Sequence, residues 1–130
     1  MHVDEFLKKE NREALARELT KEGLFELKEE TIRGNTYNTF ASAPKTLGEY
    51  FQFALIHGEW DFLAYEDESY SYQEVLNKAA GLAHVMQEKY DIKKGDSVAF
   101  SMRNYPEWIY SYMAVTSIGA IAVPLNSWWQ

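Results

Sequence analysis

Apolar and polar residues show two different spacings in the N-terminal third of the chain. Between residues 4 and 22 the apolar side chains fall near one face of a helix, at Phe6, Leu7, Ala14, Leu15 and Leu19. Gly23 gives the stop signal for that helix. Phe25 and Leu27 then alternate with Glu26 and Lys28, and the turn signal Arg33-Gly34-Asn35 is followed by Thr36–Phe40, so we predict a β-hairpin over residues 25–41.

A second helix is predicted after the boundary at Ala43-Pro44-Lys45. Its apolar stripe has helical spacing and consists of Leu47, Tyr50, Phe51, Ala54 and Leu55. Thr46 and Glu49 have the spacing of a capping box, in which the hydroxyl accepts a backbone N–H bond and the carboxylate reaches back to the cap residue. Gly58 ends this helix.

The middle of the chain predicts a second hairpin and a longer helix. The hairpin spans residues 62–71 around the acidic turn Glu66-Asp67-Glu68. Ser71 and Glu74 form another capping box at the start of the helix. The apolar stripe of that helix is made of Tyr72, Val75, Leu76, Ala79, Leu82, Ala83 and Met86.

The C-terminal part of the chain predicts a strand, a helix and another strand. A polar turn at residues 91–96 precedes a strand over 98–102, a helix over 106–118 and a strand over 120–123. Strands joined through a helix run parallel, with a right-handed crossover. We therefore predict an α/β fold, in which an N-terminal helix and two β-hairpins are followed by a helix–strand–helix–strand unit forming part of a parallel sheet.

Four residues are expected to mark where the last helix and the last strand begin or end. Asn104 is placed to cap the helix, and Pro106 lies in its first turn, where proline is tolerated. Gly119 is expected to end the helix. Pro124 is expected to stop the final strand.

The segment from Trp108 to Gln130 carries no charged residue. Transmembrane segments share this property, but polar residues, glycine and proline interrupt the run, so we favour a buried helix and a buried strand. Such elements need cover on nearly every side, and little sequence remains to supply it. We therefore expect the chain to be an incomplete part of a larger domain, and to self-associate through residues 108–130 when it is alone.

Charge and cysteine content exclude several classes of function. The net charge of −7 argues against nucleic acid as a partner, because phosphate recognition needs clustered cations. The absence of cysteine excludes disulfides, thiolate metal sites and cysteine nucleophiles. Residues 1–9 lack the apolar run of a signal peptide, so we expect a cytoplasmic protein.

The sequence contains no complete catalytic or ligand-binding motif. Its seven glycines are too widely spaced to form a phosphate-binding loop. His57, Glu59 and Asp61 are the best metal-binding candidates, but we favour a polar helix end there. An aromatic group lies at the start of the helix predicted over 106–118. No cations interleave with it, so we favour core or interface positions over a platform for stacking nucleic-acid bases. Its members are Tyr105, Trp108, Tyr110 and Tyr112. We therefore assign no catalytic, cofactor-binding or metal-binding residue.

Several short blocks follow one another in a distinctive order. They are Ser71–Val75, Ala83-His84, Lys94–Ala99, Arg103–Trp108 and Gly119–Asn126. Together they resemble the N-terminal region of the AMP-forming acyl-CoA synthetases, in the adenylate-forming superfamily that also holds luciferases and peptide-synthetase adenylation domains. The stretches Ile32–Gly34, Ala43-Pro44, the helix that leads to His57-Gly58, and Pro124–Trp129 are more similar to the fatty-acyl-CoA ligase branch.

This resemblance implies a parent enzyme that uses ATP, Mg²⁺ and CoA. A carboxylate attacks the α-phosphate of ATP to give an acyl-adenylate and pyrophosphate, and the thiol of CoA then displaces AMP. In the family this chemistry belongs to a Gly-rich loop ending in Pro-Lys-Gly, an acidic residue that holds the ribose and a Lys on a C-terminal domain. No part of this chain matches those motifs, so we expect the fragment alone to be an inactive scaffold that binds no cofactor.

We divide the chain into a charged N-terminal helix over residues 1–22 and a truncated AMP-binding, acyl-CoA synthetase-like domain over residues 23–130. Two other interpretations stay open. One is a free-standing interaction or dimerisation module derived from this fold. The other is a different adenylate-forming branch, with an aryl, luciferase-like or amino-acid substrate.

Overall fold

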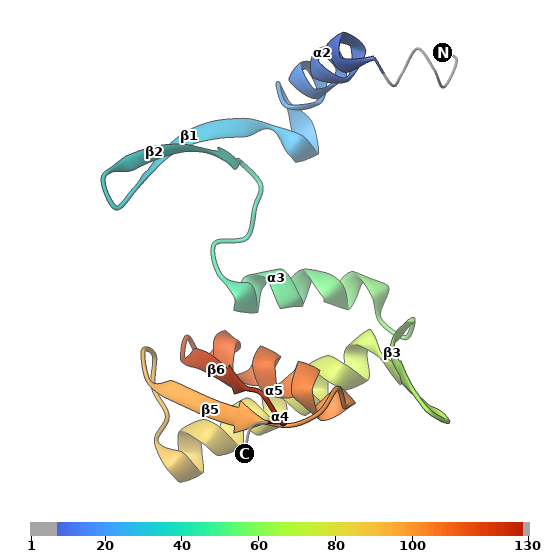
Figure 1. Cartoon of the computed structure of the whole chain (residues 1–130), viewed down its shortest axis with the longest axis vertical. Coiled ribbons are helices and arrows are strands. Elements are labelled where there is room, and N and C mark those ends of the chain that lie inside the picture. The colour runs from blue at the N-terminus through green and yellow to red at the C-terminus, as the bar shows by residue number, and fades with distance from the viewer. Residues whose placement is uncertain (1–7, 129–130) are drawn as a thin grey trace. The chain divides into compact units, whose positions relative to one another are not determined.

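The computed structural model describes residues 8–128 and divides into two compact units, residues 1–43 and 44–130 (Figure 1). Residues 4–7 of the first predicted helix lie outside the described residues, as do Trp129 and Gln130. The first unit contains a helix and a hairpin, and the second contains the remaining helices and strands.

The helix of the first unit is shorter than predicted. α2 (Lys9–Leu19) ends before Gly23: the amide of Lys21 donates to the carbonyl of Glu18, three residues back, at 3.3 Å, and the Thr20 hydroxyl donates to the carbonyl of Ala16 at 2.8 Å. Gly23, with φ +82°, instead opens the 3₁₀ turn η1 (Gly23–Phe25). The predicted stop signal therefore lies in the connection to the hairpin.

The hairpin of the first unit forms where it was predicted. β1 (Leu27–Ile32) pairs with β2 (Asn35–Phe40) in an antiparallel register that sets Leu27 opposite Phe40. Both turn residues, Arg33 and Gly34, have positive φ, as a type I′ turn requires. None of the described residues of this unit is buried, so the unit has no core of its own.

The second unit begins with α3 (Leu47–Phe53), which tightens into the 3₁₀ turn η2 (Ala54–His57) before Gly58. The Thr46 hydroxyl accepts from the amide of Glu49 at 3.1 Å, as predicted. The other half of the predicted capping box is wrong. The Glu49 carboxylate accepts from the amide of Lys45, at 2.8 Å, and therefore bonds one residue before the cap.

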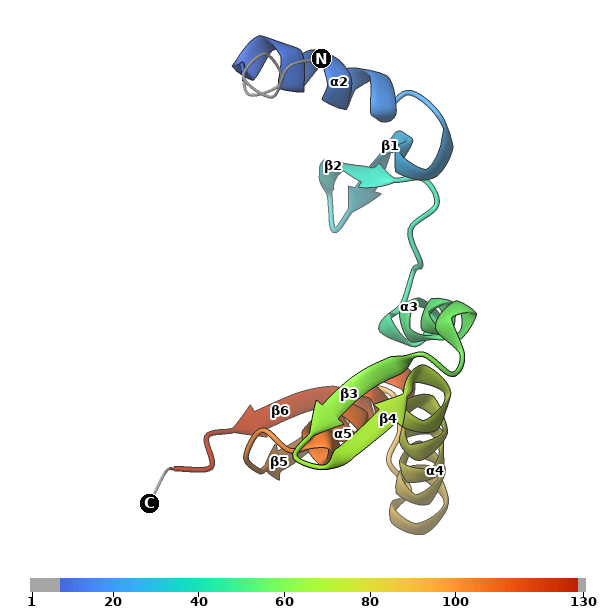
Figure 2. The same cartoon turned by 90° about the vertical axis from the view of Figure 1, so that its right-hand side faces the viewer.

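The second hairpin leads directly into the longest helix (Figure 2). β3 (Asp61–Tyr65) and β4 (Glu68–Ser71) are antiparallel, with an irregularity between Asp61 and Leu63. α4 (Tyr72–Tyr90) starts at the predicted capping box, and both of its bonds are present. The Ser71 hydroxyl accepts from the amide of Glu74 at 3.2 Å, and the Glu74 carboxylate accepts from the amide of Ser71 at 2.8 Å.

The last three elements confirm the predicted parallel pair. β5 (Ser97–Ser101) and β6 (Ile121–Leu125) run parallel, and α5 (Pro106–Ser117) connects them. Pro106 occupies the first turn of α5, and Gly119 follows the helix with φ +77°.

Two predicted limits of these elements are wrong. The cap residue of α5 is Tyr105 rather than Asn104, and no side chain caps the helix. Proline at the first helical position removes one of the amides that a cap side chain would satisfy. Pro124 lies within β6, opposite Phe100, and does not end the strand. In the described part of the chain β6 is paired along one edge only. Proline is tolerated in such an edge strand, because the missing N–H falls on the unpaired side.

The core of the second unit lies between α4 and α5. Val75, Ala79 and Met113 are its buried centre, and α3, β3 and β4 contribute side chains around it. α5 is therefore well covered by this chain itself, contrary to the expected shortage of cover. The expectation holds for β6 and Trp128, because Ile121 is 53% exposed and Trp128 is 72% exposed. No helix in residues 8–128 is long and apolar enough to cross a membrane.

Candidate functional site

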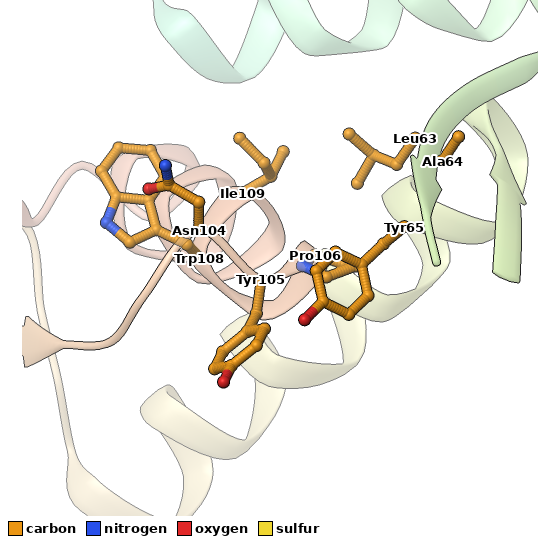
Figure 3. A pocket seen from close by; sticks show the side chains of 8 residues that line it. All are labelled: Leu63, Ala64, Tyr65, Asn104, Tyr105, Pro106, Trp108 and Ile109. Atoms are coloured by element: carbon orange, nitrogen blue, oxygen red, sulfur yellow. The ribbon is translucent and has the colours of Figure 1, made fainter. Parts of the chain in front are cut away.

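A small apolar cleft lies between β3 and the start of α5. Its volume is about 310 Å³. Figure 3 shows the side chains that line it. It is lined by Leu63, Ala64, Tyr65, Asn104, Tyr105, Pro106, Trp108 and Ile109. No local sequence signal predicts this cleft, because its two walls belong to segments far apart in the chain.

Aromatic contacts fix the walls of the cleft. Tyr65, the last residue of β3, meets Tyr105 edge to face, with ring centroids 5.5 Å apart and an interplanar angle of 86°. Trp108 stacks on Tyr112 at 5.6 Å and meets the edge of Phe100 at 5.7 Å. The rings therefore join the hairpin, the start of α5 and β5 into one surface.

The polar side chains that line the cleft carry no charge at physiological pH. Partial burial, reinforced by the nearby Glu66 carboxylate, raises the pKa of Tyr65. Burial also raises the pKa of Tyr110, with a further contribution from a hydrogen bond to Glu107. Both phenols therefore keep their protons, and the cleft presents hydrocarbon, phenol and one amide.

The residues that line the cleft do not fit a nucleoside triphosphate or Mg²⁺. No cation lines it, whereas phosphate recognition uses cationic side chains or a nest of amides. Within residues 8–128 no group of three His, Asp or Glu side chains could hold a metal ion. We therefore derive no step of adenylation from this cleft.

A second hollow, of about 520 Å³, adjoins the first and shares Tyr65, Asn104, Tyr105 and Trp108 with it. Its other wall comes from the segment after β6. Arg103 lies over the ring of Trp128, 4.5 Å from the centroid, in a cation–π contact. This contact brings together the Arg103–Trp108 block and Trp128.

The other blocks of the family resemblance also meet in space. The amide of Gly95 donates to the carbonyl of Gly119 at 3.0 Å, and the amide of Ile121 donates to the carbonyl of Asp96 at 2.7 Å. A Cβ at Gly119 would lie 3.0 Å from the side chain of Lys94. These residues therefore have structural roles in turns and strand starts, as the sequence indicated.

The remaining candidates from the sequence also pack structurally. His57 lies against the rings of Trp60 and Tyr72, with centroids 5.4 and 4.9 Å away, and not in a metal-binding cluster. The predicted aromatic group of α5 divides in two: Trp108, Tyr110 and Tyr112 are half-buried, while Tyr105 is exposed and turns to Tyr65.

Comparison with known proteins gives a consistent family. Residues 51–130 match the family model described as AMP-binding enzyme. The chain is 28% identical over 96 residues to long-chain fatty acid transport protein 6 of Homo sapiens, covering 74% of this chain and 16% of that protein. It is 40% identical over 57 residues to crotonobetaine/carnitine–CoA ligase of Salmonella paratyphi A, covering 44% of this chain and 10% of that protein.

Solved structures with the same fold are adenylation proteins and ligases. The N-terminal subdomain of Klebsiella oxytoca NpsA superposes with a TM-score of 0.63 at 27% identity, covering 67% of this chain and 23% of that one. The coronafacic acid ligase of Pectobacterium brasiliense, in its R395G form, gives a TM-score of 0.61 at 28% identity and covers 65% and 17%. The chain thus spans less than a quarter of each of these proteins.

Proposed function

Because the chain belongs to the AMP-binding enzyme family, we propose that it is the N-terminal segment of an ATP-dependent acyl-CoA ligase that acts on a fatty acid. The match over residues 51–130 is the observation that carries this proposal. The similarity to a long-chain fatty acid transport protein and to a CoA ligase supports the acyl-CoA branch.

In this proposal the chain supplies scaffold for an active site built mainly by other residues of the enzyme. The family blocks form a helix cap, strand starts and a helix start, and the cleft at the start of α5 is uncharged. ATP, Mg²⁺ and CoA supply the phosphoryl and thioester chemistry of the longer protein. The residues of this chain hold α4, α5 and the β5–β6 pair in place.

Pyrophosphate release from ATP tests both parts of the proposal. We expect the 130-residue chain to release no pyrophosphate with any carboxylic acid, and a polypeptide that continues beyond Gln130 to release it with fatty acids. Turnover by the chain alone would refute the scaffold role. Turnover of the longer polypeptide without CoA-thioester formation would refute the ligase assignment.

A second candidate is another adenylate-forming branch. Its support is the similarity to NpsA, solved with 3-hydroxyanthranilyl-AMSN, and to coronafacic acid ligase. The same assay separates the two candidates, because aryl or amino acids in place of fatty acids would drive pyrophosphate release. A cytoplasmic location and a domain boundary at residue 22 stay predictions, which cell fractionation and limited proteolysis can test.

A further inference from the structure

The contact between Tyr65 and Tyr105 sets these two residues apart from the other tyrosines of the chain. Their ring centroids are 5.5 Å apart, and the interplanar angle is 86°. All nine tyrosines lie within residues 8–128, and in that range no other two tyrosine rings make a ring contact. Figure 3 shows one ring of the pair carried by β3 and the other by the residue before α5. The fold therefore places two phenols together that the sequence separates widely.

Two phenol rings in contact can be joined by oxidation. A one-electron oxidant takes one electron from each phenol, each phenol loses its proton, and the unpaired electron of each radical is shared with the ring carbons beside the oxygen. The two radicals form a carbon–carbon bond between such carbons, and the hydrogens of these carbons move to the oxygens and restore both hydroxyls. Overall two electrons and two protons leave the pair. Hydrogen peroxide accepts them as its O–O bond breaks, which gives two molecules of water.

The surroundings of the pair favour this reaction. The Tyr65 hydroxyl is hydrogen-bonded to the Glu66 carboxylate, which can accept the phenolic proton as the electron leaves. Tyr105 is 41% exposed, so an oxidant in solution can reach its ring. The chain has no cysteine, and therefore no thiol of its own consumes the oxidant or reduces the radicals. The steep angle between the rings is compatible with the product, because rings joined by a single bond beside two hydroxyls are twisted.

We propose that Tyr65 and Tyr105 form a site of oxidative modification, at which a peroxide-driven one-electron oxidant joins the two rings by a carbon–carbon bond. The bond ties β3 to the start of α5 across the cleft and closes a covalent loop over residues 65–105. Closing a loop restricts the unfolded chain, so the cross-linked form is expected to melt at a higher temperature than the unmodified form. This proposal is independent of the proposed enzymatic function.

A haem peroxidase with hydrogen peroxide, applied to the 130-residue chain at low concentration, tests the site. We expect dityrosine fluorescence in the fraction that migrates as a monomer on a denaturing gel. Mass spectrometry of a digest is expected to find the peptides of Tyr65 and Tyr105 joined, with a mass two hydrogen atoms below their sum.

Tyr65→Phe and Tyr105→Phe are each expected to abolish the fluorescence of the monomer, because a phenyl ring forms no phenoxyl radical. Tyr90→Phe is the matched control, since Tyr90 is 61% exposed and lies outside the pair, and it is expected to leave the fluorescence unchanged. Circular dichroism confirms that each variant is folded.

Three results would overturn the proposal: dityrosine confined to covalent dimers, with none in the monomer; monomer fluorescence that survives Tyr65→Phe or Tyr105→Phe; or a digest in which other tyrosines are joined within one chain and these two are not.

Discussion

The Ser71–Glu74 capping box shows how far single residues determine this structure. Two hydrogen bonds join the last residue of β4 to the first turn of α4, and Ser71 is almost fully buried. The box was predictable because all its atoms lie within four consecutive residues. Local signals of this kind are the most reliable part of the sequence, since no distant segment decides whether they form.

Loss of this cap is expected to destabilise the second unit. Ser71→Ala removes the acceptor for the Glu74 amide and is expected to lower the free energy of unfolding by about 1 kcal/mol. Urea denaturation followed by circular dichroism measures the effect. Ser69→Ala, in the exposed part of the same strand, is the control and is expected to cost less. Equal losses in the two variants would argue against a role for the cap.

Tyr70 is expected to make stability depend on pH in the alkaline range. Its hydroxyl donates to the Glu68 carboxylate, and this bond raises the pKa of Tyr70 from 10.0 to about 12. The folded chain therefore holds this proton to a higher pH than the unfolded chain does. The resulting stabilisation is complete below pH 10 and is lost as the pH rises from 10 toward 12.

The Tyr70→Phe variant tests this dependence. Its free energy of unfolding is expected to fall less steeply than that of the wild type between pH 10 and pH 12. Urea titrations followed by tryptophan fluorescence at several pH values give the two slopes. Tyr37→Phe, in the first unit, should reproduce the wild-type slope. A Tyr70→Phe slope as steep as that of the wild type would contradict the prediction.

At the scale of elements, α4 owes its position to one buried stripe. Val75 is fully buried against α5, whereas Val85, further along the same helix, is 43% exposed. Val75→Ala is expected to cost about 2 kcal/mol of unfolding free energy, because it leaves a cavity between the helices. Val85→Ala is the matched control and is expected to change stability by less than about 0.5 kcal/mol. Similar losses from the two substitutions would mean that the core lies elsewhere.

The elements themselves were largely predictable from the sequence, and their limits were not. The apolar stripe of α4 identifies a helix directly, and the turn signal Arg33-Gly34-Asn35 identifies the hairpin of β1 and β2. The roles of Glu49, Asn104 and Pro124 were mispredicted because each depends on geometry that spacing does not specify: which amide is nearest, where the helix starts, and which strand edge is free.

The cleft at the start of α5 was missed for a related reason. It depends on contact between Tyr65 and Tyr105, which come from separate elements. No sequence motif links Tyr65 to Tyr105, so their contact can be recognised only in the folded structure. Family likeness, by contrast, was predictable because it resides in the order of short blocks along the chain.

For the whole molecule, the absence of a core in the first unit has a measurable consequence. None of residues 8–43 is buried, whereas α4 and α5 share a buried interface. We expect the amides of β1 and β2 to exchange with solvent much faster than those of α4 and α5. Hydrogen exchange followed by mass spectrometry measures both. Equal protection of the two regions would show that the hairpin is held by contacts beyond its own unit.

The hydrogen bonds between the Gly95 and Gly119 turns have a further consequence for how this sheet tolerates mutation. Both strands are aligned at their first residues by amides and carbonyls, which every amino acid except proline provides in full. The hydrogen bonds that set where the two strands begin therefore do not depend on which side chains the strands carry. Substitutions can accumulate along the strands without shifting one past the other, provided that the two glycines keep their positive φ angles. A pair of strands built in this way can persist among relatives whose sequences have diverged widely.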